Sequence, residues 1–124
     1  MAENITILIA DRNPNVREFL KREMAAENYR VMLADDGKTL LKKAFESHRV
    51  DVLIIDPDFP DMESSDIFSR LKSRIPPLPV VIHALPEEEF DCQGFCSSIF
   101  IEKGSRSIEV IKKTIRDIIT ERAI

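Results

Sequence analysis

An apolar run passes directly into an acidic turn at Val52-Leu53-Ile54-Ile55-Asp56-Pro57-Asp58-Phe59-Pro60. Unbroken apolarity over four residues is typical of a strand that is covered on both faces, as strands of a parallel sheet are. Similar runs of Ile, Val and Leu recur elsewhere, so we expect several short buried strands. The runs cover residues 5–10, 31–34, 52–55, 80–84 and 99–101.

The segments between these runs carry apolar residues at a helical spacing. Asn13 followed by Pro14 is typical of a helix N-cap with proline at the first helical position, and Ser107 is expected to cap the last helix. Residues 86–90 form a plausible first helical turn, but the period is lost over residues 91–95, so a helix there is expected to be short or frayed. The clear stripes are Val16, Phe19, Leu20 and Met24; Leu40, Leu41, Ala44 and Phe45; Ile67, Phe68, Leu71 and Ile75; and Ile108, Ile111, Ile115, Ile118 and Ile119.

Strands and helices therefore alternate along the whole chain, and this predicts a single α/β domain over residues 1–124. Five βα units would form a doubly wound, five-stranded parallel sheet with right-handed crossovers and helices on both faces. The composition agrees, because 44% hydrophobic and 32% charged residues are typical of a globular protein.

Charge and hydropathy exclude several classes of function. The formal net charge of −4 disfavours direct nucleic-acid binding. No apolar stretch approaches the roughly 20 residues of a membrane helix, and no signal peptide is visible. We therefore expect a cytoplasmic protein. Cys92 and Cys96 are interpreted as two reduced thiols, with a redox pair as the alternative.

Charged side chains follow three of the predicted strands. Asp11 follows the first strand, Asp56 the third, and Lys103 the fifth. Ligands of open parallel sheets bind at the carboxyl ends of the strands, so these side chains are expected to converge at one edge. Carboxylates can bind a divalent cation or act as nucleophiles, and a lysine can pair with phosphoryl oxygens.

These stretches resemble the receiver domain of bacterial two-component response regulators, of the single-domain chemotaxis-regulator type. The resemblance covers essentially the whole chain and is carried by Ile7-Leu8-Ile9-Ala10-Asp11, by residues 52–60, and by Phe100-Ile101-Glu102-Lys103. It implies a flavodoxin-like receiver fold. By position, Asp56 matches the family's phosphoacceptor, Asp11 the first member of its acidic pair, and Lys103 its lysine. The family uses Mg²⁺, so Asp11, Asp56 and Asp58 become candidate metal-site residues.

Several positions depart from the family's pattern. Arg12 stands where the family has a second acid that binds magnesium, which predicts weak or absent magnesium binding. Ala84 stands where the family has the Ser or Thr of its switch, and Phe100 stands at the switch aromatic. His83 is adjacent to Ala84 but points to the opposite face of its strand. Gly104 and Ser64 replace a proline and a glycine, respectively.

Two of these acidic-pocket residues have open interpretations. Arg12 either points into solvent, or its guanidinium enters the pocket and pairs with Asp56, Asp58 or Asp11 in place of the cation. The Asp58 carboxylate either forms the turn or partly replaces the acid that is missing at residue 12.

The leading hypothesis is a receiver domain that accepts a phosphoryl group on Asp56 from a histidine kinase or phosphotransfer protein, without being an enzyme beyond its own phosphorylation and dephosphorylation. It would signal through a partner, a homodimer, or an output domain absent from this chain. The first alternative is a pseudo-receiver, which serves as a phosphorylation-independent binding or dimerisation module. A remote alternative is a haloacid-dehalogenase-type phosphohydrolase, because Asp56-Pro57-Asp58 forms a D-x-D pattern after a strand.

Overall fold

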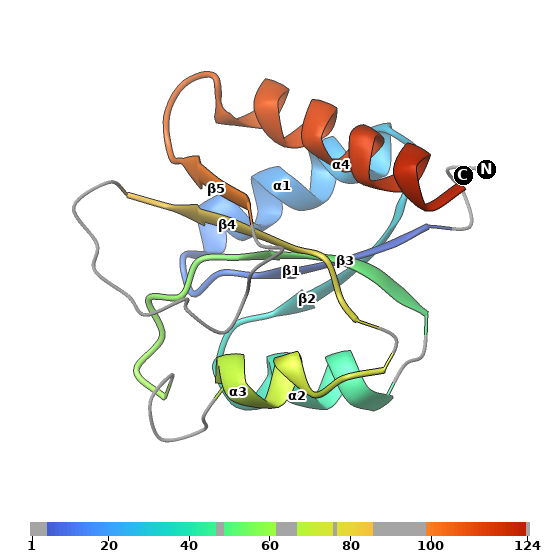
Figure 1. Cartoon of the computed structure of the whole chain (residues 1–124). Helices are drawn as coiled ribbons and strands as arrows, with labels where there is room; N and C mark the ends of the chain where they lie inside the picture. The colour runs from blue at the N-terminus through green and yellow to red at the C-terminus, as the bar shows by residue number, and fades with distance from the viewer. Residues whose placement is uncertain (1–4, 47–48, 62–66, 76, 86–98, 124) are drawn as a thin grey trace.

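A computed structural model of the chain describes residues 5–46, 49–61, 67–75, 77–85 and 99–123. The predicted strands form one parallel sheet in the order β2-β1-β3-β4-β5 (Figure 1). The predicted doubly wound parallel sheet is thereby confirmed. The strands are β1 (Thr6–Ala10), β2 (Arg30–Ala34), β3 (Val50–Ile55), β4 (Val80–Ala84) and β5 (Ile99–Glu102).

Helices cover both faces of this sheet. In Figure 1, α1 (Pro14–Ala26) and α4 (Ser107–Ala123) lie on one face, and α2 (Gly37–Glu46) and α3 (Ile67–Lys72) lie on the other. Asn13 caps α1 as predicted, since its side-chain oxygen accepts hydrogen bonds from the backbone N–H groups of Asn15 and Val16. The helix predicted over residues 86–95, with Cys92 in it and Cys96 just beyond, lies outside the described residues.

The sheet separates two hydrophobic cores, which explains why its strands are apolar on consecutive residues. On β3, for example, Leu53 and Ile55 pack into the core beneath α2 and α3, while Val52 and Ile54 pack into the core beneath α1 and α4. All four are essentially inaccessible to solvent. The buried strands thus hold their carboxyl ends rigidly, and these ends carry the candidate site.

Some details of the helices differ from the sequence prediction. Phe19 and Phe45, assigned to the apolar stripes of their helices, are exposed, because α1 and α2 bury a narrower stripe against the sheet. Ile75 is also exposed, since α3 already ends at Lys72. Ser107 is the first residue of α4, and its hydroxyl donates to the carbonyl of Gly104 instead of capping the helix.

Candidate functional site

Asp11 and Asp56 lie at the carboxyl ends of the neighbouring strands β1 and β3, where the strand order reverses. Their backbones continue the sheet, because the N–H of Asp11 donates to the carbonyl of Ala34 over 3.2 Å and that of Asp56 to Ala10 over 2.9 Å. Both residues are buried. The sheet thus fixes two carboxylates side by side at the position where open α/β sheets bind ligands.

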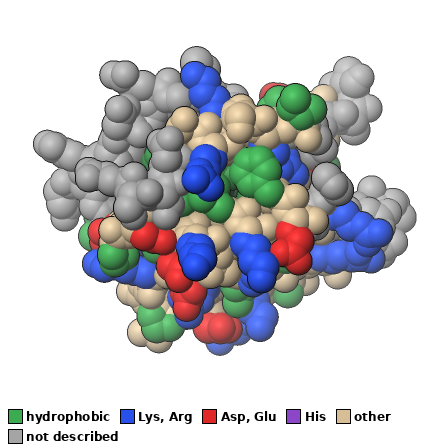
Figure 2. All heavy atoms as spheres, turned by 90° about the horizontal axis from the view of Figure 1, so that it is seen from below, with side chains coloured by type: hydrophobic (Ala, Val, Ile, Leu, Met, Phe, Trp, Pro, Cys, Tyr) green, Lys and Arg blue, Asp and Glu red, His purple; other side chains and the backbone are tan. Residues whose placement is uncertain are grey.

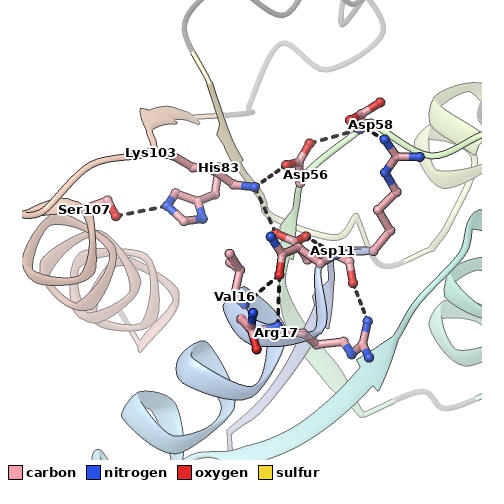
Figure 3. Close-up of polar contacts among 11 residues, drawn as sticks. Asp11, Val16, Arg17, Asp56, Asp58, His83, Lys103 and Ser107 are labelled. Atoms are coloured by element: carbon pink, nitrogen blue, oxygen red, sulfur yellow. Dashed lines mark hydrogen bonds and ion pairs between the residues drawn. The ribbon is translucent and has the colours of Figure 1, made fainter.

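Lys103 completes this cluster from the far side of β4. Its backbone N–H donates to the carbonyl of Ala84 over 2.8 Å, at the end of the β4–β5 ladder. Its side chain reaches back across the end of β4, so that Nζ contacts Asp56 Oδ2 and lies 3.2 Å from Asp11 Oδ2 (Figure 3). The convergence of these three side chains, predicted from their places after the strands, is confirmed.

The second oxygen of each carboxylate is held by the backbone two residues further on. Asp11 Oδ1 accepts from the N–H of Asn13 over 2.8 Å, and Asp56 Oδ1 accepts from that of Asp58 over 3.0 Å. These are Asx turns, in which an aspartate fixes the loop that follows it. Each carboxylate is therefore oriented, with one oxygen toward its own loop and the other toward Lys103.

Burial and the neighbouring charges shift the pKa values of Asp11 and Lys103. Burial raises the pKa of Asp11 above its ordinary value, although the Asn13 N–H and the charge of Lys103 oppose the shift. Burial alone would lower the pKa of Lys103, but its hydrogen bond to Asp56 and the charges of Asp11 and Asp56 outweigh this effect and raise it. Lys103 is therefore cationic at neutral pH, between two carboxylates.

Arg12 pairs with Asp58 at the rim of the site. Its Nη2 lies 3.2 Å from Asp58 Oδ2, and the two side chains are 54% and 52% exposed. Pairing with Asp58 was one of the predicted arrangements, but the guanidinium lies at the exposed rim and not within the buried pocket. The same contact engages the Asp58 carboxylate, which was one candidate to replace the acidic side chain that is missing at residue 12.

The carboxylates that could hold a magnesium ion are each engaged by a cationic side chain in this structure. Lys103 already contacts both Asp11 and Asp56, and Arg12 engages Asp58. Among the described residues, no group of three or more His, Cys, Asp or Glu side chains is arranged to hold a metal. A small divalent cation of this kind prefers several oxygen ligands, which Arg12 cannot supply.

The two positions of the expected switch are placed as follows. Ala84 is fully buried in the core beneath α2 and α3, and Phe100 is 49% exposed on β5. His83 points to the opposite face, as predicted, where its Nε2 lies 3.0 Å from Ser107 Oγ. Ser64 lies outside the described residues.

Two residues that support the site were not predicted from the sequence. Asp61 accepts hydrogen bonds from the first backbone N–H groups of α2, at Gly37 over 2.9 Å and Lys38 over 3.0 Å, and so ties the turn after Asp56 to that helix. A Cβ on Gly37 would come within 2.8 Å of Asp61. Arg17 Nη1 donates to the Asp11 carbonyl over 2.8 Å. The Asp61 contacts have no local sequence signal, because they join segments 23 and 24 residues apart that only the fold brings together. Arg17 is only six residues from Asp11, but no sequence pattern marks an arginine that bonds a backbone carbonyl of the preceding loop.

Comparisons with known proteins agree on one family. The family profile described as response regulator receiver domain matches residues 7–117. Response regulator GtcR of Aneurinibacillus migulanus is 32% identical over 111 residues, which cover 87% of this chain and 45% of that protein. The probable transcriptional regulatory protein TcrX of Mycobacterium tuberculosis is 31% identical over 78 residues, or 63% of this chain and 33% of that protein. The chain thus spans less than half the length of either relative.

Solved structures show the same fold. The response regulator protein TrrA of Thermotoga maritima, solved in complex with Mg²⁺-BeF, superposes with a TM-score of 0.79 at 21% identity, covering 92% of this chain and 98% of that one. A second structure holds TrrA in complex with histidine kinase ThkA and superposes with a TM-score of 0.76 at 22% identity, over 92% of this chain and 97% of that one. Within the described part of the chain, no helix has the length and apolarity needed to span a membrane.

Proposed function

Because the chain belongs to the response regulator receiver family of two-component signal transduction, which is a family of signalling domains and not of enzymes, we propose that it accepts a phosphoryl group on Asp56. The donor would be a phosphohistidine of a histidine kinase or of a phosphotransfer protein. One observation supports this most strongly: Lys103 Nζ contacts both Asp56 and Asp11 at the carboxyl edge of the sheet.

The transfer itself needs only a positioned nucleophile and a stabilised charge. An oxygen of the Asp56 carboxylate attacks the phosphorus atom, the P–N bond of the phosphohistidine breaks, and its electron pair stays on the leaving imidazole nitrogen. Negative charge on the phosphoryl oxygens is stabilised by nearby cations, which in such reactions contribute most of the catalysis. Lys103 is the cation in contact with Asp56, so we assign it the role of pairing with a phosphoryl oxygen.

Arg12 supplies a second cation at the entrance to the site. The guanidinium forms a planar fork of donors that suits phosphoryl oxygens as well as carboxylates. Its partner Asp58 follows Asp56 by two residues, and the pair is exposed, so the contact is weak and can exchange. We propose that Arg12 leaves Asp58 for the incoming phosphoryl group and provides charge that a metal ion would otherwise supply.

A second candidate is a pseudo-receiver, which binds a partner or dimerises without being phosphorylated. It is favoured by Ala84, whose buried methyl group offers no hydroxyl to the phosphoryl group, and by the Arg12–Asp58 ion pair. The carboxylates of Asp11 and Asp56 around Lys103 favour the phosphorylated receiver. Burying two acidic side chains lowers the stability of the fold, so a domain that needs neither of them would gain nothing from keeping them.

The localisation, the domain extent and the signalling partners are proposed from membership of the family alone. We propose a cytoplasmic setting, one receiver domain over residues 1–124, and signalling through a partner protein, a second copy or an output domain. Transcriptional regulation, which appears in the name of one relative, belongs to a whole protein of which this chain covers a third. The phosphohydrolase alternative is set aside, because Asp56 follows the third strand of a receiver sheet.

Intact-mass spectrometry after incubation with acetyl phosphate tests the proposal. We expect the mass of one phosphoryl group to be added to the native protein, with magnesium present or chelated, and no addition to Asp56→Asn. A gain that strictly requires magnesium would reject the role of Arg12 but keep that of Asp56. If neither acetyl phosphate nor a phosphorylated histidine kinase or phosphotransfer domain gives an adduct, the pseudo-receiver is favoured.

A further inference from the structure

The turn that carries Lys103 into α4 is not held by packing. Residues 104–106 are all exposed, and a Cβ on Gly104 would meet nothing within 4 Å. Gly104 also has no positive φ, so neither space nor backbone conformation requires glycine there. The backbone N–H of Lys103 is held by the Ala84 carbonyl, but the turn that follows it needs a restraint of its own to stay in place.

That restraint comes from Ser107, at the start of α4. Its backbone N–H donates to the Gly104 carbonyl over 3.1 Å, and its hydroxyl donates to the same oxygen over 2.9 Å. The Ser107 oxygen in turn lies 3.0 Å from Nε2 of His83 (Figure 3). His83 belongs to the interior of β4, pairs in register with Ile101, and is only 4% exposed. The turn is thus tied to a buried residue of the sheet.

The directions of these hydrogen bonds follow from the donors available. With the Ser107 hydroxyl proton assigned to the Gly104 carbonyl, the Ser107 oxygen is left to accept, and this assignment makes His83 the donor, from Nε2–H. Nδ1 is then the unprotonated nitrogen, and it is buried without a hydrogen-bond partner among the described residues. Burial keeps the ring neutral by lowering the pKa of His83 to about 4, and the charge of Lys103 acts in the same direction.

A role in packing alone does not explain a histidine at this position. An unpaired buried nitrogen costs free energy, whereas an aliphatic side chain on the same face would pack among Val81, Ile101 and Ile111 without that cost. Among the described residues the ring makes one polar contact, with the Ser107 hydroxyl, and that hydroxyl also bonds the Gly104 carbonyl in the turn after Lys103.

We propose that His83 is a positioning residue for Lys103: through the Ser107 hydroxyl it fixes the turn over residues 103–107, and so keeps the ammonium group between Asp56 and Asp11. The geometric part of this proposal is independent of phosphorylation. Its consequence, faster phosphoryl uptake, rests on the function proposed for Asp56.

The test observes the ammonium group of Lys103 directly by ¹H–¹⁵N NMR, with the signal assigned by its loss in Lys103→Arg. His83→Gln keeps a donor near the place of Nε2, and His83→Leu removes it at similar volume. Ser107→Ala removes the acceptor. Ser73→Ala is the matched control, because Ser73 also donates its hydroxyl to the carbonyl three residues earlier, at Arg70, away from the site.

We expect hydrogen exchange of the Lys103 ammonium group to be slow in the native protein, in His83→Gln and in Ser73→Ala. In His83→Leu and Ser107→Ala it should be about fivefold faster, which corresponds to the loss of one neutral hydrogen bond. The double variant should be no faster than either single one, since both changes break the same link.

An unchanged Lys103 signal in folded His83→Leu or Ser107→Ala would overturn the proposal, and so would equal effects of the Gln and Leu variants. If His83→Leu does not fold, Ser107→Ala decides alone, because Ser107 is only partly buried and its substitution removes a single oxygen atom. Phosphoryl uptake is then measured on the same proteins. Faster exchange in a protein whose native form takes up no phosphoryl group would support the positioning role and reject the function proposed for Asp56.

Discussion

Acidification should destabilise this fold through His83 in particular. The native state keeps the ring neutral down to a pKa of about 4, because the side chain is buried, whereas the unfolded chain binds a proton at the ordinary value of 6.5. The unfolded state thus binds more protons between these values, and stability is lost as the pH falls through that window. The full effect is about 3 kcal/mol, at 1.36 kcal/mol per pH unit. About 2 kcal/mol of it develops between about pH 7 and about pH 5.

Urea unfolding at these two pH values, followed by circular dichroism because the chain has no Trp, measures this loss. His83→Gln provides the comparison, since the amide does not titrate while every carboxylate is unchanged. The native protein should lose about 2 kcal/mol more than the variant between the two conditions. Equal losses in both proteins would contradict this prediction, because they would mean that His83 is protonated as readily in the folded state as in the unfolded one.

Three further predictions concern the site itself. Arg12→Asp should create a magnesium site, seen as saturable NMR shifts around Asp56 during a titration, whereas tight binding by the native protein would contradict our interpretation of Arg12. Asp61→Ala should lower the free energy of unfolding by about 1 kcal/mol in urea, as expected for a lost helix cap; unchanged stability would show that the bond to α2 contributes nothing. Lys103→Met should raise the pKa of Asp11 further, because it removes the neighbouring positive charge. Carboxyl ¹³C NMR measures that pKa, and an unchanged value would contradict the pairing.

The sheet could be predicted from the sequence because its signals are local. The run at residues 52–55 is apolar on both faces, and the structure buries it between two cores. The convergence of Asp11, Asp56 and Lys103 could also be predicted, since parallel strands place their carboxyl ends at one edge. Their roles in phosphoryl transfer stay predictions.

Other features of the site depend on tertiary contacts that no local pattern signals. Asp61 caps a helix that begins 24 residues before it, and His83 contacts Ser107, which lies 24 residues after it. Ser107 itself was expected to cap α4, because serine before an apolar stripe usually does. Arg12 was given several possible partners, and only the turn geometry selects Asp58. In each case the residue type was informative, but its partner depended on how separate loops meet.

Borohydride reduction identifies the phosphoacceptor, because it converts an aspartyl phosphate into homoserine and so marks the residue that carried the phosphoryl group. The protein is incubated with acetyl phosphate or a phosphorylated histidine-containing donor, reduced, digested and sequenced by mass spectrometry. We expect homoserine at residue 56. Homoserine at residue 11 or 58 instead, or none at all while a known receiver is labelled in parallel, would contradict it.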